Sequence, residues 1–172
     1  DALLIYSNFS QSIEKSEIKD TLTFFENYPD VNAFELARNN FIIIRAKNTI
    51  NNIKIKLDLD ATYVYKALGG GDNCWLRFWI VGFVEPYTIG DPTIVNDLLY
   101  SKYFSGNTDQ SEILPSELTY EVATLPKDYS LALFVEMDFN RAVTGDSDHR
   151  PYAEFRKFDT TVTGAYTSLN TV

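Results

Sequence analysis

The sequence contains very little of the chemistry that cysteine and histidine provide. Its 172 residues include one cysteine, Cys74, and one histidine, His149. A disulfide within the chain and a cysteine-based zinc site are therefore excluded. Cys74 alternates with apolar residues in the segment CWLRFWI, so we expect it to be a buried, unreactive side chain in a strand.

The single histidine stands beside Ser147 and Asp148 in the segment TGDSDHRP. Members of a catalytic triad come from distant segments, whereas neighbours in an extended loop point apart. The chain also has no Gly-x-Ser-x-Gly pattern, which would place a nucleophilic serine on a sharp turn. We therefore predict a polar turn between strands at residues 131–139 and 152–162, with no catalytic role for His149.

Basic residues are also scarce. There are 15 Lys and Arg against 24 Asp and Glu, which gives a net charge of −9 and a pI of about 4.5. Such a surface repels phosphate backbones and anionic lipid, so we expect no nucleic-acid partner. No apolar run approaches the roughly 20 residues that a membrane-spanning helix needs, so we expect no membrane span.

Glycine is sparse as well, and three of the eight glycines stand together at residues 69–71. A phosphate-binding loop would place them between a strand and a helix, followed by Lys and Ser or Thr. Here Asp72 and Asn73 follow, and then an apolar run typical of a strand. We therefore predict a hairpin turn that pairs residues 53–68 with residues 74–85 in antiparallel fashion.

Hydrophobic residues, in contrast, are abundant at 45%, and aromatic residues make up 15%. In residues 53–68 apolar or aromatic side chains recur at every odd position, with Lys and Asp at positions between them. This period of two is typical of a strand with one solvent-exposed face. In residues 74–85 both faces are largely apolar, which indicates a central strand. Further strands are predicted at residues 2–9, 41–47, 118–125, 131–139 and 152–162.

Helical signals are few. Asp30 can cap a helix over residues 31–39, and Asp91 followed by Pro92 is typical of the start of a second helix that Gly106 ends. Within this second segment apolar residues recur four positions apart, as on one side of a helix.

Together these patterns predict a mainly β fold. We expect an antiparallel β-sandwich or jelly-roll-like single domain over residues 1–172, with two short helices in the connections. Residues 1–40 add little obvious sheet and allow an irregular N-terminal arm.

Both tryptophans lie on the second face of the strand at residues 74–85, on either side of Arg77. If that face were open, Trp75 and Trp79, with Tyr63 or Tyr65, would form a platform for stacking sugars, and Arg77 would supply its polar edge. The alternative, which we favour, is that these rings fill the interior of the sandwich or a contact between subunits.

Oxygen ligands for calcium could gather where Asp146 and Asp148 follow a strand that carries Glu136 and Asp138. This spacing lacks the fuller pattern of any specific calcium site, and acidic turns are ordinary in a protein of this charge. We therefore expect no cofactor and keep calcium as the alternative.

No motif identifies a reaction. The strand-rich pattern and the surplus of aromatic surface favour a non-enzymatic structural or assembly subunit, such as part of a capsid-like shell, a fibre or a surface appendage. Its partners would be other protein subunits in a homo- or hetero-oligomer. The chain begins with Asp1, which points to processing and favours an extracellular, cell-surface or virion location. The alternatives are a ligand-binding module, foremost a carbohydrate-binding one, and a small hydrolase.

Overall fold

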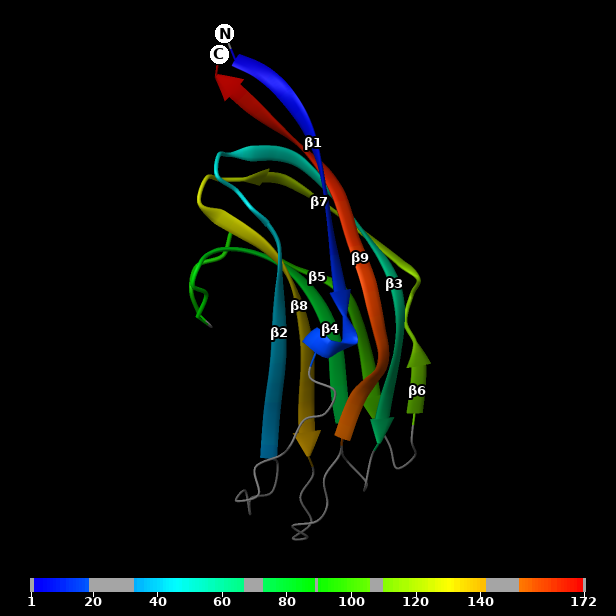
Figure 1. Ribbon diagram of the computed structural model, residues 1–172. Coiled ribbons are helices and arrows are strands. Elements are labelled where there is room, and N and C mark those ends of the chain that lie inside the picture. The colour runs from blue at the N-terminus through cyan, green and yellow to red at the C-terminus, as the bar shows by residue number, and fades with distance from the viewer. Residues whose placement is uncertain are drawn as a thin grey trace.

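The structure is a computed structural model that describes residues 2–18, 33–66, 73–88, 90–105, 110–141 and 152–171. These residues form nine strands and a short 3₁₀ turn (Figure 1). The elements are β1 (Ala2–Glu14), η1 (Lys15–Glu17), β2 (Ala33–Arg45), β3 (Ile50–Lys66), β4 (Asn73–Val84), β5 (Val95–Ser105), β6 (Gln110–Ile113), β7 (Glu117–Leu125), β8 (Tyr129–Arg141) and β9 (Tyr152–Thr171).

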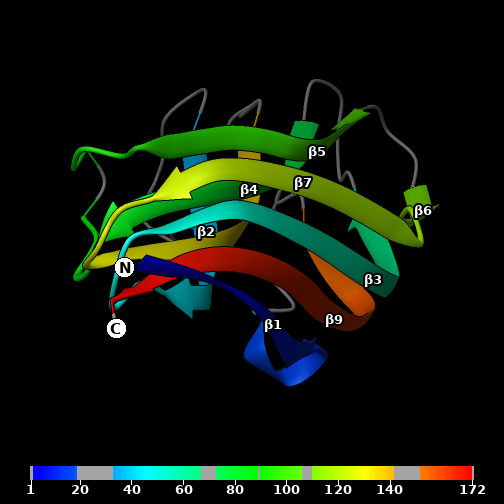
Figure 2. The ribbon, with the colours of Figure 1, turned by 90° about the horizontal axis from the view of Figure 1, so that it is seen from above.

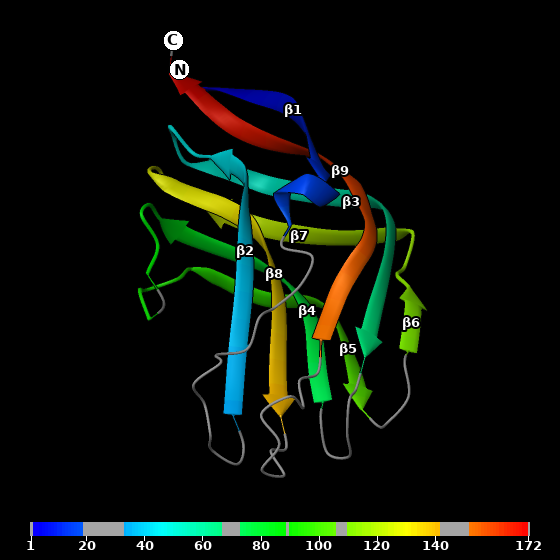
Figure 3. The same ribbon diagram turned by 60° about the horizontal axis from the view of Figure 1, so that its bottom comes forward.

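The strands form two antiparallel sheets. The large sheet has five strands in the order β1-β9-β3-β6, with β7 also paired to β3, and Figure 2 shows β1, β9, β3 and β7 side by side. The small sheet has four strands in the order β2-β8-β4-β5, as Figure 3 shows. The chain is thus mainly β with two antiparallel sheets, which confirms this part of the predicted fold class.

The pairing between strands is nested along the chain. The first strand, β1, pairs with the last, β9; β2 pairs with β8, β3 with β7, and β4 with β5. The two ends of the chain therefore lie side by side, because Ala2 is the partner of Thr171 (Figure 1).

The core lies between the facing sides of the two sheets. Along β3 every second residue from Ile53 to Tyr65 is buried, and the residues between them face outward, as the alternation in the sequence predicts. From the small sheet, Cys74, Leu76 and Phe78 are buried against them. Phe78 reaches the large sheet, where its ring centroid lies 6.2 Å from that of Phe158 on β9.

The predicted hairpin between residues 53–68 and 74–85 is wrong. β3 pairs with β9, β7 and β6, whereas β4 pairs with β8 and β5, so the two strands belong to different sheets. The apolar faces of β3 and β4 pack against each other in the core, where the Tyr63 hydroxyl lies 3.4 Å from Cys74 Sγ. The chain thus crosses between sheets here, and residues 67–72 lie outside the described residues.

The two predicted helices are also wrong where the structure describes them. Residues 33–39 belong to β2, which pairs with β8, and residues 95–105 belong to β5, which pairs with β4. In both cases pairing with a neighbouring strand overrides the local helical signal. The described part of the chain contains no α-helix, and hence no helix that could cross a membrane.

Regular structure begins close to the start of the chain. β1 pairs with β9 at thirteen consecutive positions, and β2 begins at Ala33. Residues 2–14 and 33–40 therefore lie in strands, as predicted for residues 2–9, although the sequence also allowed an irregular arm over residues 1–40.

Candidate functional site

The outer face of the small sheet carries an unusual mixture of aromatic, apolar and charged side chains. Alternation along β4 sends Cys74, Leu76 and Phe78 into the core and leaves the residues between them on the outside. Their neighbours across the sheet come from β5 and β8. We call the following set the aromatic face: Trp75, Arg77, Trp79, Leu98, Tyr103, Glu136 and Asp138.

Arg77 is the ionic centre of the aromatic face. Its Nη1 donates to Glu136 Oε1 at 3.0 Å and to Asp138 Oδ2 at 2.8 Å. The Trp79 indole also donates to Glu136 Oε1, at 3.4 Å. Glu136 is only 3% exposed, so its charge is balanced by a guanidinium that the neighbouring strand places opposite it.

The environment keeps Arg77 charged. Burial by itself lowers the pKa of the guanidinium, but the hydrogen bonds to Asp138 and Glu136 outweigh it, so the pKa is raised. The Arg77 guanidinium therefore pairs with two carboxylates, those of Glu136 and Asp138, at a partly buried site.

Trp75 is held on the same face by two contacts. The Arg77 guanidinium carbon lies 4.9 Å from the centroid of the Trp75 ring, and the Tyr103 ring lies 4.8 Å away at an interplanar angle of 47°. A cation near the ring and a tilted aromatic neighbour both stabilise this arrangement. Contacts within the chain thus define the orientation of the indole.

Further along the same outer face, the chain covers its own apolar surface. A buried cluster of Val81, Phe83, Ala132 and Phe134 packs with Trp79, Ile42 and Tyr87. Tyr87, in the connection that follows β4, places its ring 5.0 Å from that of Phe83 and 5.5 Å from that of Phe134. Contacts within the chain therefore cover this part of the outer face.

Two side chains of the aromatic face on β5 stay exposed. Leu98 is 47% exposed and Tyr103 is 44% exposed, while Trp75 and Trp79 are half-buried. Sequence reasoning missed Leu98 and Tyr103 because it assigned their segment to a helix.

The structure does not bring the two tyrosines of the predicted sugar platform to this face. Tyr63 and Tyr65 are fully buried in the core. The Tyr63 ring packs 5.3 Å from Phe104 and 5.0 Å from Phe155. Of the five residues predicted for that platform, Trp75, Arg77 and Trp79 share a face, and the two tyrosines lie in the core.

The predicted calcium ligands are only partly described. Asp146 and Asp148 lie outside the described residues, as do Ser147 and His149. Glu136 and Asp138 bind Arg77. Within the described segments no group of three or more His, Cys, Asp or Glu side chains is arranged to hold a metal ion.

Cys74 is fully buried, as the sequence predicts. Burial raises the pKa of its thiol to about 12, and the hydrogen bond with Tyr63 opposes this only in part. The thiolate, which is the reactive form, is therefore suppressed at neutral pH.

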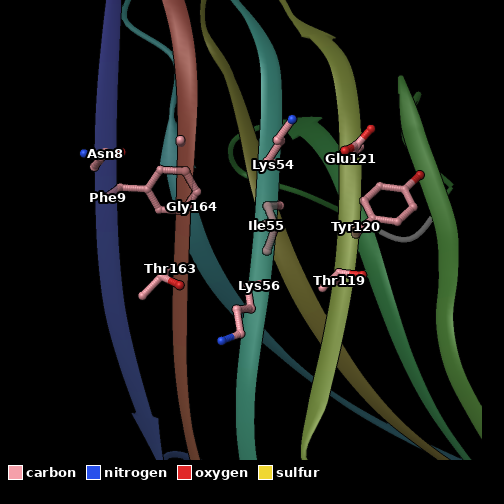
Figure 4. Close-up of a pocket in the computed structure, with 11 residues that line it drawn as sticks. Asn8, Phe9, Lys54, Ile55, Lys56, Thr119, Tyr120, Glu121, Thr163 and Gly164 are labelled. Carbon is pink, nitrogen blue, oxygen red and sulfur yellow. The ribbon is translucent and has the colours of Figure 1, made fainter.

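A hollow of about 870 Å³ lies on the large sheet, over β1, β9, β3 and β7 (Figure 4). Its lining includes Asn8, Lys54, Lys56, Thr119 and Glu121, all exposed. Because these alternate with residues such as the buried Ile55, the hollow belongs to the outer side of the sheet.

The polar groups at this hollow have the character of a solvated surface. The Lys56 ammonium lies 3.0 Å from Asp58 and 3.3 Å from Glu117, and these pairs raise its pKa. The lining contains lysine, threonine and glutamate side chains but no cysteine, serine or histidine, so it lacks the Ser–His or Cys–His pair of many acyl-transfer enzymes.

Comparison with known proteins gives no family. No protein-family model matches the chain, and no curated protein matches its sequence. One similar solved structure is that of infectious bursal disease virus, Gx strain, with 11% identity and a TM-score of 0.26; the match covers 94% of this chain and 40% of that chain. Another is the VP2 subviral particle of infectious bursal disease virus, with 10% identity and a TM-score of 0.25; the match covers 93% of this chain and 40% of that chain. The chain thus spans about 40% of the length of these chains. At such TM-scores the likeness carries no argument about fold or function.

Proposed function

We propose that this chain is a non-enzymatic structural or assembly subunit that acts through contacts between copies of itself. A capsid-like shell, a fibre or a surface appendage would use it in this way, in a virion or at a cell surface. The contact surface in this proposal is the aromatic face of the small sheet.

The nested strand order supports a jelly-roll arrangement. In a jelly roll two antiparallel sheets pack together, and the architecture is used by viral capsid domains and by lectins. The pairs β1–β9, β2–β8, β3–β7 and β4–β5 fit this plan. Because one fold hosts many functions, the choice between assembly and sugar binding has to come from the surface.

The observation that carries the proposal is the composition and order of the aromatic face. Protein interfaces are enriched in Trp, Tyr and Arg at their centres, and rigid aromatic anchors supply most of the binding energy. Here Trp75 is fixed between Arg77 and Tyr103, with the exposed Leu98 further along β5. The charges of Arg77, Glu136 and Asp138 are already paired within the face, so a partner need not neutralise them.

The same geometry weakens the carbohydrate-binding alternative. A sugar stacks on the free flat side of an indole, but Trp75 already has the Arg77 guanidinium against its ring. Trp79 packs into the apolar cluster beside Tyr87, and Tyr63 and Tyr65 lie in the core. The Trp75 and Trp79 rings thus pack against neighbouring side chains and do not form separate platforms on which a sugar could stack.

Sedimentation velocity of the pure protein, from low to high micromolar concentration, tests the proposal. We expect the wild type to form larger species as concentration rises. The double variant L98S/Y103S removes two exposed apolar side chains from the face and should form smaller species, with an unchanged far-ultraviolet circular dichroism spectrum. Trp79 is unsuitable for this test, because it also packs within the chain's own apolar cluster.

The matched control is I113S. Ile113 is 81% exposed and lies on β6 of the large sheet, whereas the aromatic face belongs to the small sheet. It should associate like the wild type. A wild type that stays monomeric at high micromolar concentration, or an L98S/Y103S variant that associates normally, overturns the proposal. Sugar-induced quenching of tryptophan fluorescence in a monomer would then favour the carbohydrate-binding alternative.

A further inference from the structure

The strand at one margin of the large sheet has an unpaired edge. β1 is the outermost strand of that sheet, and one of its edges pairs with β9 from Ala2 to Glu14 without a register shift (Figure 2). No strand of the described chain pairs with its other edge. The backbone N–H and C=O groups along that edge are therefore available to a further strand.

The edge of β1 also lacks the features that usually protect such strands. Natural edges are blocked by charged side chains, by proline, by bulges or by their shortness. From Ala2 to Ile13 the sequence ALLIYSNFSQSI contains no charged residue, no proline and no glycine. A long, regular and uncharged edge is a template for strand pairing.

The other margins are protected by comparison. β2 carries Glu35 and Arg38 and has a register shift, and β5 carries Asp97 and Lys102 and has another. At the other margin of the large sheet, β6 is only four residues long, and β7, which among the described strands pairs only with β3, carries Glu117 and Glu121. Among the edges of the described sheets, β1 therefore has the longest uncharged and regular edge to which a further strand could pair.

We infer that β1 pairs antiparallel with β1 of a second copy, so that two large sheets become one continuous sheet. This inference rests on the proposed assembly function and adds a second contact surface to it. A twofold axis perpendicular to the sheet keeps the outer sides of both sheets on the same side. Full overlap then places Asn8, the middle residue of β1, opposite the same residue of the other copy.

Charge is the argument for a second copy as the partner. The protein carries a net charge of −9, and like charges directly opposite each other on paired strands are destabilising. β1 can pair with itself because residues 2–13 bring no charge into the contact. A twofold contact of this kind also closes on itself, so it gives a defined dimer and not an open stack of strands.

Exposed apolar side chains beside this edge fit the same contact. Tyr6 is 65% exposed, and Leu169, on the adjacent strand β9, is 60% exposed. The partner of Tyr6 is Thr167, so Leu169 lies two positions further along the same side of the sheet. A second copy joined at β1 would bring the corresponding side chains of its own sheet close to this region.

The test is a charge exchange in the L98S/Y103S background, which removes the contact through the aromatic face. That protein should be a dimer by sedimentation velocity. Asn8 and Ser10 are exposed and lie on the outer side of β1. We expect N8K/S10K and N8E/S10E each to be monomeric, because like charges then meet across the contact. An equimolar mixture of the two should recover the dimer.

The control T119K/A123K places two lysines at exposed positions of β7 in the same sheet and should leave the dimer intact. All variants should keep the β-sheet spectrum of the parent. Lysine variants of β1 that remain dimeric, or a mixture that remains monomeric, overturn the inference. An L98S/Y103S protein that is already monomeric, while the wild type associates, overturns the β1 contact and leaves the proposed function standing. If the wild type itself does not associate, both are wrong.

Discussion

Replacement of Arg77 by methionine is the most direct test of how the aromatic face is held together. The change removes the cation, whose guanidinium carbon lies 4.9 Å from the centroid of the Trp75 ring, and keeps most of the aliphatic stem. Glu136, 3% exposed, then loses the partner that balances its charge, and Asp138 loses the same guanidinium.

Loss of one partner of a buried ion pair costs about 3–5 kcal/mol of the free energy of unfolding. Two features of this site reduce that figure. The Arg77 side chain is 22% exposed, and Glu136 keeps the hydrogen bond from the Trp79 indole. We therefore expect R77M to lower the free energy of unfolding by about 2–3 kcal/mol at neutral pH.

Urea denaturation followed by far-ultraviolet circular dichroism measures this loss at low protein concentration. The double variant R77M/E136Q removes the uncompensated charge and should recover about half of the loss. R45M is the matched control, since Arg45 also pairs with a carboxylate, Glu85, but both side chains are exposed. Such a pair contributes little, so R45M should hardly change stability. Equal effects of R77M and R45M, or no recovery with E136Q, would refute this account of the face.

Two further predictions concern the core and the surface of the large sheet. Cys74 should react slowly with a thiol reagent in the native protein and rapidly in denaturant. Because its pKa is raised from 9.0 to about 12, the folded state keeps a proton that the unfolded state releases between these values, so the free energy of unfolding should fall as pH rises from 9 to 12. The variant C74A should lack this part of the fall. Asp159 lies opposite Glu14 on one side and Asp60 on the other. D159N should therefore raise the melting temperature at low salt, with a smaller gain at high salt, and a lower melting temperature would contradict this.

The strands and their faces could be predicted from the sequence because they depend on local alternation. In β3 and β4 the residues that alternate as apolar in the sequence are those that the core buries, including Ile55 and Leu76. Burial of Cys74 follows from the same pattern.

Which strands pair could not be predicted in this way. A turn-forming segment between two alternating runs fits a hairpin and also fits a crossing between sheets, and local pattern does not distinguish them. β3 and β4 have strong apolar faces that fit either arrangement. Only the positions of β9 and β8, which come much later in the chain, decide that the two strands lie in different sheets.

The helix predicted after Asp91 fails for a related reason. β5 has a register shift against β4, since Phe78 is opposite Tyr100 but Trp79 is opposite Leu98. The extra residue interrupts the period of two and leaves apolar side chains at spacings that suit a helix. For the aromatic face, the sequence placed Trp75, Arg77 and Trp79 on one side of a strand but contained no local signal for their contacts with β5 and β8.

The nested strand order has a consequence for how the chain folds. β4 and β5 are neighbours along the chain and can form a hairpin early, whereas β1 must wait for β9, which follows all the other described strands. Closing such long loops costs entropy before the contacts that repay it exist, and chains rich in distant pairings fold slowly. During synthesis on a ribosome, the β1 margin of the large sheet would therefore be completed only after β9 has emerged. Until then β1, the least protected strand, has no partner within its own chain, so the order of synthesis sets the interval in which it can pair wrongly.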